Sequence, residues 1–205
     1  AMSNLDISEA GLWTVTINRP EKANSLTTEM LEELVDIAGR AQAARGLILT
    51  GAGKVFSAGA DLDEARAGLA TSTVWERLSA ALAAVPCLKI AALNGTLAGG
   101  ANGMALACDI RLAVPGAKVF YPVMKLGYLP QPSAVGRMAA LIGPARTKMI
   151  LAAGQKIEAP EACAWGLVDR LVDPEDLMAQ AQALLADSLA AKIEIASGIL
   201  EMCQS

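Results

Sequence analysis

The chain has 205 residues, of which 54% are hydrophobic but only 3% aromatic, and its formal net charge is −4. That length suits one α/β domain with a large aliphatic core, and an acidic chain without a basic stripe is not expected to bind nucleic acid. Histidine is absent, which excludes Ser-His-Asp and Cys-His catalysis, so neither a zinc site nor any other metal site is expected.

The cysteines and the first residues predict a cytoplasmic protein. No Cys-x-x-Cys pair occurs, and three of the cysteines lie in apolar surroundings, as reduced and buried thiols do; the four are Cys87, Cys108, Cys163 and Cys203. Residues 1–11 lack the basic start and apolar run of a signal peptide. No repeat or Pro/Ser-rich linker divides the chain, so we expect a single unit.

The first half of the chain alternates strand and helix patterns. Residues 12–17 (LWTVTI) alternate apolar and polar side chains, which predicts a half-buried strand. After a turn, Thr27 or Thr28 can cap a helix whose apolar positions repeat at helical spacing and predict simple core packing; they are Met30, Leu34, Ile37 and Ala41. Residues 46–51 (GLILTG) form an apolar run typical of a strand buried on both faces.

The second half continues this alternation. Residues 74–85 predict a helix that Pro86 ends, and residues 88–95 and 108–114 predict strands. Near the C-terminus a strand precedes Asp173, which we expect to cap a last helix over about 175–191. Strands that alternate with helices predict βαβ units and a mainly parallel sheet, hence one α/β domain.

The stretch KIAALNGTLAGGANGMALACD, residues 89–109, carries no charge between its ends and admits three interpretations. A membrane span is disfavoured because glycine, asparagine and threonine dilute its hydrophobicity. A nucleotide-binding loop is disfavoured because neither G-x-x-x-x-G-K-[ST] nor G-x-G-x-x-G occurs in it. The third interpretation is a strand, a turn at Gly99 and Gly100, and a helix whose first amide N–H groups are free to bind an oxygen.

A second stretch, KVFSAGADLDEA (residues 54–65), follows the buried strand 46–51 with another small-residue junction. Two junctions on a parallel sheet can each direct one amide N–H at a common point. A thioester carbonyl that becomes an enolate needs such a pair of donors. The two stretches together therefore favour an oxyanion site over simple helix–strand packing.

Five segments in order resemble the crotonase (enoyl-CoA hydratase/isomerase) family: INRPEKANSL, LTGAGKVFSAGADL, ALNGTLAGGANGMALACDIRLA, YPVMKLGYLP and the pattern AxxAxxWGLVDRLV. The resemblance implies a spiral of ββα units over residues 1–170, with a shortened helical segment for trimerisation over 171–205. It also implies an acyl-CoA substrate, no separate cofactor, a homotrimer or dimer of trimers, and no membrane or nucleic-acid partner. The resemblance also implies further C-terminal helices that cover the acyl-CoA site of a neighbouring subunit. The sequence leaves little room for them after EIASGILEMCQS, so we expect a more open pocket or a different trimer.

Transferred onto this sequence, the resemblance implies that the oxyanion donors are the amides of Ala58 and Gly100. Contacts to the substrate would come from Lys22, Ala23, Asn24, Leu26, Gly59, Ala60, Asp61, Gly99, Val123 and Gln131. Two of these residues have an alternative explanation that involves no substrate. Lys22 could be a solvated turn residue, and Asp61 could be a helix cap. We likewise expect Asn102 to be a hydrogen-bonding residue at the exit of its turn.

Two departures from the family pattern bear on the reaction. The resemblance implies catalytic glutamates at positions 103 and 123, where this chain has Gly103 and Val123. Neither residue can move a proton, and hydration of a double bond needs both a base and an acid. Ordinary hydratase activity is therefore not expected. Tyr128 is the candidate proton donor, unless it is a packed or rim tyrosine, and Gln131 is polar but cannot act as a base.

Two functional hypotheses follow. In the first, the protein is an enzyme that forms an acyl-CoA enolate, with decarboxylation the best chemical fit because loss of CO₂ needs no base; isomerisation and thioester hydrolysis are weaker options. In the second, the protein is a catalytically degenerate family member that binds acyl-CoA or only its own subunits.

Overall fold

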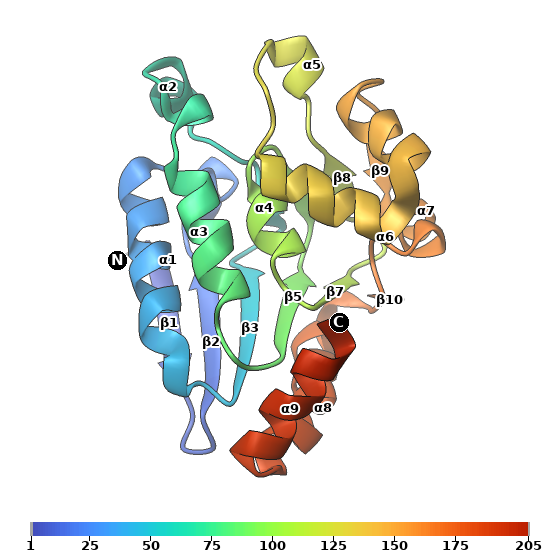
Figure 1. Cartoon of the computed structure of the whole chain (residues 1–205). Coiled ribbons are helices and arrows are strands. Elements are labelled where there is room, and N and C mark those ends of the chain that lie inside the picture. The colour runs from blue at the N-terminus through green and yellow to red at the C-terminus, as the bar shows by residue number, and fades with distance from the viewer. Residues whose placement is uncertain (1, 205) are drawn as a thin grey trace.

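Two sheets divide the strands of the chain between them. The computed structural model describes residues 2–204 and places six strands in one sheet, in the order β1-β2-β3-β5-β7-β10, and four in a second, in the order β4-β6-β8-β9 (Figure 1). In the larger sheet only β1 runs antiparallel to its neighbour, and in the smaller sheet only β9 does. The strands are Ser3–Ile7 (β1), Leu12–Ile17 (β2), Gly46–Gly51 (β3), Val55–Ser57 (β4), Lys89–Leu93 (β5), Thr96–Ala98 (β6), Ile110–Ala113 (β7), Lys118–Phe120 (β8), Ile157–Glu158 (β9) and Arg170–Leu171 (β10).

From β3 to β8 successive strands alternate between the two sheets, and helices follow each pair. This alternation is the spiral of ββα units that we expected from the sequence. The helices are Thr28–Arg40 (α1), Leu62–Arg66 (α2), Val74–Ala83 (α3), Ala101–Leu106 (α4), Val123–Leu126 (α5), Pro132–Leu151 (α6), Ala159–Trp165 (α7), Leu177–Ala190 (α8) and Ile193–Gln204 (α9). Short 3₁₀ turns are Pro20–Lys22 (η1), Ala41–Ala43 (η2), Leu69–Thr71 (η3) and Pro174–Asp176 (η4).

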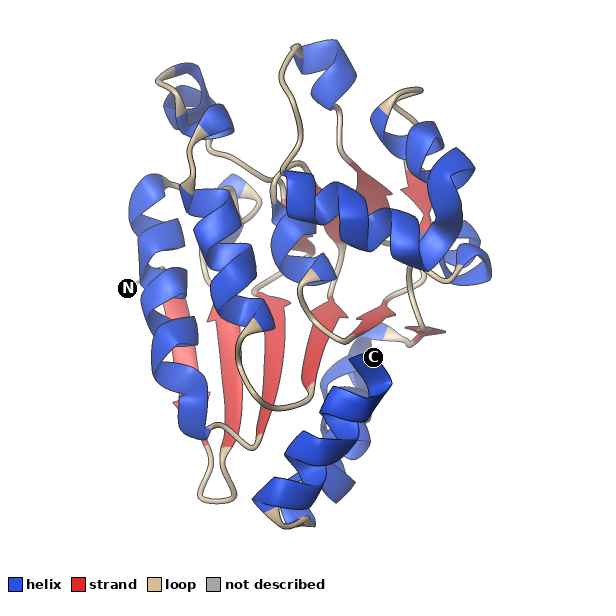
Figure 2. Ribbon diagram, viewed as in Figure 1, coloured by secondary structure: helices blue, strands red, loops and turns tan. Residues whose placement is uncertain are grey.

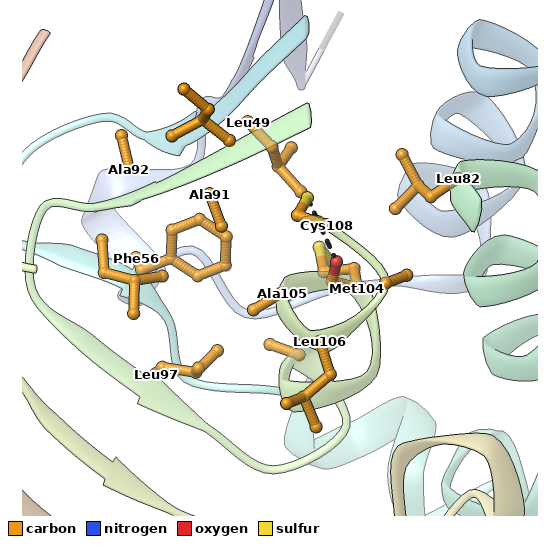
Figure 3. Close-up of a cluster of buried hydrophobic side chains, with 14 of the residues drawn as sticks. Leu49, Phe56, Leu82, Ala91, Ala92, Leu97, Met104, Ala105, Leu106 and Cys108 are labelled. Carbon is orange, nitrogen blue, oxygen red and sulfur yellow. Dashed lines mark hydrogen bonds between the residues drawn. The ribbon is translucent and has the colours of Figure 1, made fainter. Parts of the chain in front are cut away.

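Helices α1 and α3 lie side by side over the larger sheet, whereas α8 packs against β3, β5 and β7 of that sheet and α9 follows α8 in the chain (Figures 1 and 2). Aliphatic side chains fill the space where the strands meet α4. Figure 3 shows the Phe56 ring beside Ala91, with Met104 and Ala105 of α4 nearby, and all four residues are buried. The low aromatic content predicted this kind of core. None of the described helices combines the length and the apolar character that a bilayer span requires.

Several local predictions are confirmed. Strands 12–17 and 46–51 have the predicted bounds, and the predicted helix 74–85 is α3. Thr27 is the N-cap of α1, because its hydroxyl accepts a hydrogen bond from the Met30 N–H at 3.1 Å. The predicted apolar face of this segment is buried.

Other local predictions need correction. The turn-rich middle of the stretch 89–109 contains the strand β6, which is too short to show a periodic pattern and owes its conformation to pairing with β4 and β8. Asp173 precedes η4 but makes no side-chain capping bond, and the last predicted helix begins only at Leu177, as α8. A further helix, α9, follows it. Of the three cysteines expected to be buried only Cys87 and Cys108 are, and burial raises their pKa values to about 11 and about 12.

Candidate functional site

Two strand–turn–helix junctions touch each other through their backbones. One leads from β4 through Gly59 to α2, and the other from β6 through Gly99 to α4; both glycines have positive φ, 91° and 61°. A Cβ on Gly59 would lie 2.9 Å from the Ala98 carbonyl oxygen, so only glycine permits this approach. The sequence expectation that two small-residue junctions converge is thus realised in the fold.

Polar and charged groups hold the first junction. The Ser57 hydroxyl accepts from the Gly59 N–H at 3.1 Å and donates to the Asn24 carbonyl at 2.8 Å. Asp61 caps α2 by accepting from the backbone N–H groups of its first turn and pairs with Arg19 at 3.0 Å. These contacts, first the Glu64 N–H and then Arg19, lower the pKa of Asp61. The alternative explanation of Asp61 as a helix cap is therefore confirmed.

Buried amide side chains hold the second junction. Asn102 donates through Nδ2 to the carbonyl of Gly99 at 2.9 Å and to that of Phe120 at 3.0 Å. Gln131 donates to the Gly100 carbonyl at 2.9 Å. Asn102 is thus the hydrogen-bonding turn residue that we expected. Its bond to Gly99 orients the peptide whose N–H belongs to Gly100.

The hydrogen-bonding state of the backbone amides distinguishes the possible oxyanion donors. The Ala58 N–H donates to the Ala23 carbonyl at 3.0 Å, so the fold already uses it. By contrast, neither the Ala60 N–H nor the Gly100 N–H has an acceptor among residues 2–204. The Ala58 amide that we predicted as a donor is therefore paired within the fold, and the unpaired amide of this junction is that of Ala60, two residues further on.

Both free amides belong to residues that line one cavity of about 460 Å³ between α2 and α5. Its walls are Ala58, Ala60, Leu62, Ala65, Arg66, Ala70, Ala98, Gly99, Gly100, Phe120, Pro122, Leu126 and Tyr128. Arg66 is the one charged side chain in that set. Tyr128 supplies a hydroxyl whose pKa burial raises, so the group is neutral and able to donate a proton at pH 7.

Known proteins resemble this chain both in sequence and in structure. The sequence model of enoyl-CoA hydratase/isomerase matches residues 8–202. The chain is 40% identical to YngF of Bacillus subtilis over 182 residues, covering 84% of this chain and 70% of that protein. It is 34% identical to the 1,2-epoxyphenylacetyl-CoA isomerase of Escherichia coli over 188 residues, covering 86% and 72%. The crystal structure of an enoyl-CoA hydratase from Bacillus anthracis superposes with a TM-score of 0.90 at 30% identity, covering 100% of this chain and 83% of that one.

The chain belongs to the enoyl-CoA hydratase/isomerase family. The resemblance to crotonases and the expected spiral fold are therefore confirmed. The family assignment does not identify the reaction, because some relatives of this chain are named isomerases and others hydratases.

In this family member a neutral side chain occupies the space beside Gly103. A Cβ at position 103 would overlap Gln131 Oε1 and lie 2.9 Å from the Ser79 hydroxyl oxygen. The Ser79 hydroxyl donates to Gln131 Oε1 at 3.3 Å, and all three residues are buried. Val123 is buried at the start of α5. No carboxylate lines the cavity at either predicted glutamate position.

The other predicted substrate contacts are distributed unevenly around the cavity. Besides Ala60 and Gly100, only Ala58 and Gly99 of the predicted set line it, together with the candidate donor Tyr128. Lys22 is exposed, Leu26 is buried, and the Asn24 side chain is engaged by backbone groups of the loops around it. The contacts of these residues with substrate stay predictions.

Sequence reasoning missed the cavity walls formed by Leu62, Arg66 and Phe120. The sequence segment DLDEAR offered one signal, because the basic residue Arg66 lies close after Asp61, the expected helix cap. Among the described residues, the carboxylates of Asp173, Glu175 and Asp176 lie close enough together to share a cation, but all three are exposed and none lines the cavity.

Proposed function

We propose that this protein binds acyl-CoA thioesters and stabilises a thioester enolate between the amide N–H groups of Ala60 and Gly100. The observation that carries the proposal is the pair of unpaired amides on adjoining junctions that line one cavity. The Gly100 N–H also lies at the start of α4, where backbone donors lack partners within the helix. Each donor in such a site typically contributes about 3–4 kcal/mol to transition-state stabilisation.

Proton transfer in this cavity falls to Tyr128. Tyr128 lines the cavity, and burial raises the pKa of its hydroxyl, so the group is protonated at neutral pH and serves as a donor rather than a base. Tyr121 is less suitable because it is buried and its hydroxyl accepts a hydrogen bond from the Gln131 N–H at 3.3 Å. With Gly103 and Val123 in place of acid and base, hydration of an enoyl-CoA is not part of the proposal.

A second candidate function is acyl-CoA binding without turnover. The specific observation in its favour is the neutral Gln131 amide beside Gly103, which leaves no general base there. This candidate and the enolate proposal agree on the ligand and differ on chemistry. Decarboxylation, isomerisation and thioester hydrolysis remain subordinate reaction types of the enolate proposal.

Two measurements test the proposal. Calorimetry with acetyl-CoA and octanoyl-CoA should show binding to the wild-type protein; no binding of any thioester would refute both candidate functions. Release of CO₂ from malonyl-CoA in D₂O, with deuterium incorporated at the α-carbon and followed by NMR, should reveal the enolate, because loss of CO₂ forms it without a base. Binding of malonyl-CoA without release of CO₂ would instead support the second candidate.

The variant Ala60→Pro removes an N–H that makes no bond in the fold, and it should slow the release of CO₂ from malonyl-CoA by about 10²–10³-fold. Thermal unfolding of the variant should match that of the wild type. An unchanged rate of CO₂ release in a folded A60P protein would show that the Ala60 amide is not a donor. Light scattering of the purified protein tests the predicted homotrimer or dimer of trimers.

A further inference from the structure

We infer that Lys156 is a positioning residue for the cavity of the two free amides, because its ammonium group holds the ring of Phe120 in the wall of that cavity. The inference rests on the proposed function, since it takes the enolate to form there. Lys156 itself does not line this cavity. Both residues lie outside the five segments in which the sequence resembles the crotonase family.

Phe120 belongs both to the wall of the cavity and to the support of the second junction. It is the last residue of β8, and it lines the cavity of about 460 Å³. Its carbonyl oxygen accepts from the Gly99 N–H at 3.1 Å and from Asn102 Nδ2 at 3.0 Å. In the smaller sheet it pairs with Ala98, the residue before Gly99. The backbone of Phe120 therefore fixes the junction that presents the Gly100 N–H, while its side chain lines the cavity.

Lys156 reaches the Phe120 ring from the neighbouring strand. Strand β9 runs antiparallel to β8 and pairs Ile157 with Val119, so the next position in this register places residue 156 opposite Phe120. The Lys156 Nζ lies 4.6 Å from the centroid of the ring, within the reach of about 6 Å that a cation–π interaction has. The contact therefore joins an edge strand of the smaller sheet to the cavity wall.

The Lys156 ammonium lies over the ring although carboxylates are close by. Lys156 lines a separate polar cavity of about 480 Å³, together with Lys118, Glu158, Pro160 and Glu161. Among residues 2–204, Lys156 Nζ forms no ion pair or hydrogen bond, and the Phe120 ring is its contact. Lys156 is exposed whereas Phe120 is half-buried, so the ammonium stays hydrated while it covers the ring.

The position of the ring matters for the chemistry proposed in the cavity. A half-buried phenylalanine can adopt more than one staggered rotamer. A rotamer that moved the ring out of the wall would admit water beside the amides of Ala60 and Gly100. Backbone donors stabilise an oxyanion more strongly in a site from which water is excluded. By stabilising one rotamer of Phe120, Lys156 thus acts on the oxyanion site through a residue that lines it.

The variant Lys156→Met tests this role, since it keeps the length of the side chain and removes its charge. The kcat for release of CO₂ from malonyl-CoA should fall about two- to fivefold, the factor that an exposed cation–π contact contributes. The KM should change little, because no contact with the substrate is removed. Lys156→Arg should restore the rate, since a guanidinium also lies on aromatic rings. Lys118→Met, in the same polar cavity, is the matched control and should turn over like the wild type.

A double-mutant cycle with Phe120→Leu separates action through the ring from any other effect of the charge. In the F120L background, K156M should cause no further loss of kcat. An equal loss in both backgrounds would overturn the inference. So would a K156M variant that unfolds at a lower temperature but keeps the wild-type kcat, and in that case the proposed function would stand. If the wild type releases no CO₂, the proposed enolate chemistry itself fails, and the inference fails with it.

Discussion

The two junctions that meet at the candidate site reach the same local geometry by different means. Each runs from a short parallel strand through a glycine with positive φ to an amide N–H without a partner. The junction before α2 is held by the Ser57 hydroxyl and by the Asp61–Arg19 ion pair, whose side chains are 17% and 15% exposed. The junction before α4 is held by buried Asn102 and Gln131.

This difference indicates how each donor can be disturbed. Removal of a charge or a change of pH should disturb the first junction, which is partly exposed. Added side-chain volume or the loss of a hydrogen bond should disturb the second junction, which is buried. The point where the two backbones touch should be sensitive to any added atom. Four predictions follow this order, from the largest expected effect to the smallest.

Gly59→Ala should destabilise the protein most. The new Cβ adds a left-handed backbone penalty of about 1–2 kcal/mol and overpacks the Ala98 carbonyl by about 1–3 kcal/mol more. The control is Gly166→Ala, whose φ of 87° is close to the 91° of Gly59 but whose nearest contact would be an ordinary 3.7 Å. Chemical denaturation measures both variants. If both variants lose the same free energy of unfolding, contact between the two junctions contributes nothing to stability.

Asn102→Ala should cost about 2–3 kcal/mol, since it removes two hydrogen bonds of a buried side chain and leaves a small cavity. The Gly99 and Phe120 carbonyls each keep one backbone donor, which limits the loss. Acyl-CoA affinity should fall as well, because the Gly99–Gly100 peptide is no longer oriented. Unfolding and calorimetry on one preparation check both effects. A variant of wild-type stability and affinity would remove Asn102 from this role.

Gly103→Ala should cost about 1–3 kcal/mol, because its Cβ displaces the Gln131 amide from Ser79 and Gly100. In a Gln131→Ala background the same change should cost less, since the obstructing amide is gone. A double-mutant cycle measures this coupling, expected at about 0.5–3 kcal/mol. Additive losses would contradict the packing of Gln131 against Gly103.

Asp61→Asn should have the smallest effect and the clearest pH dependence. Because the folded-state pKa of Asp61 lies below its ordinary value of 3.8, its charge stabilises the fold above that pH and the benefit disappears as the pH falls through the folded-state value. Asparagine still caps a helix, so the variant isolates the charge. The stability gap to the wild type should be present at pH 7 and close below about pH 4. The exposed Asp6→Asn on β1 is the control, and a gap that stays constant with pH would contradict the ion-pair account.

Local chemistry predicted a large part of this fold. The Thr27 cap, the buried runs and the cap role of Asp61 follow from side chains that act within a few residues of themselves. The same locality explains the errors: β6 has three residues, and its pairing partners lie far along the chain, so no periodic pattern announces it. The residue pattern predicted one helix at this end of the chain, whereas the structure has two, α8 and α9.

The sequence by itself determined the family, the two glycine junctions and the absence of glutamate at positions 103 and 123. The tertiary structure alone decided which amide is available. Ala58 and Ala60 are both alanines beside the same glycine, yet a carbonyl 35 positions earlier in the chain accepts from the first and leaves the second free. Likewise only folding brings Gln131 into the space beside Gly103. A backbone donor is paired or free according to neighbours that the chain brings together in space, and no local pattern records them.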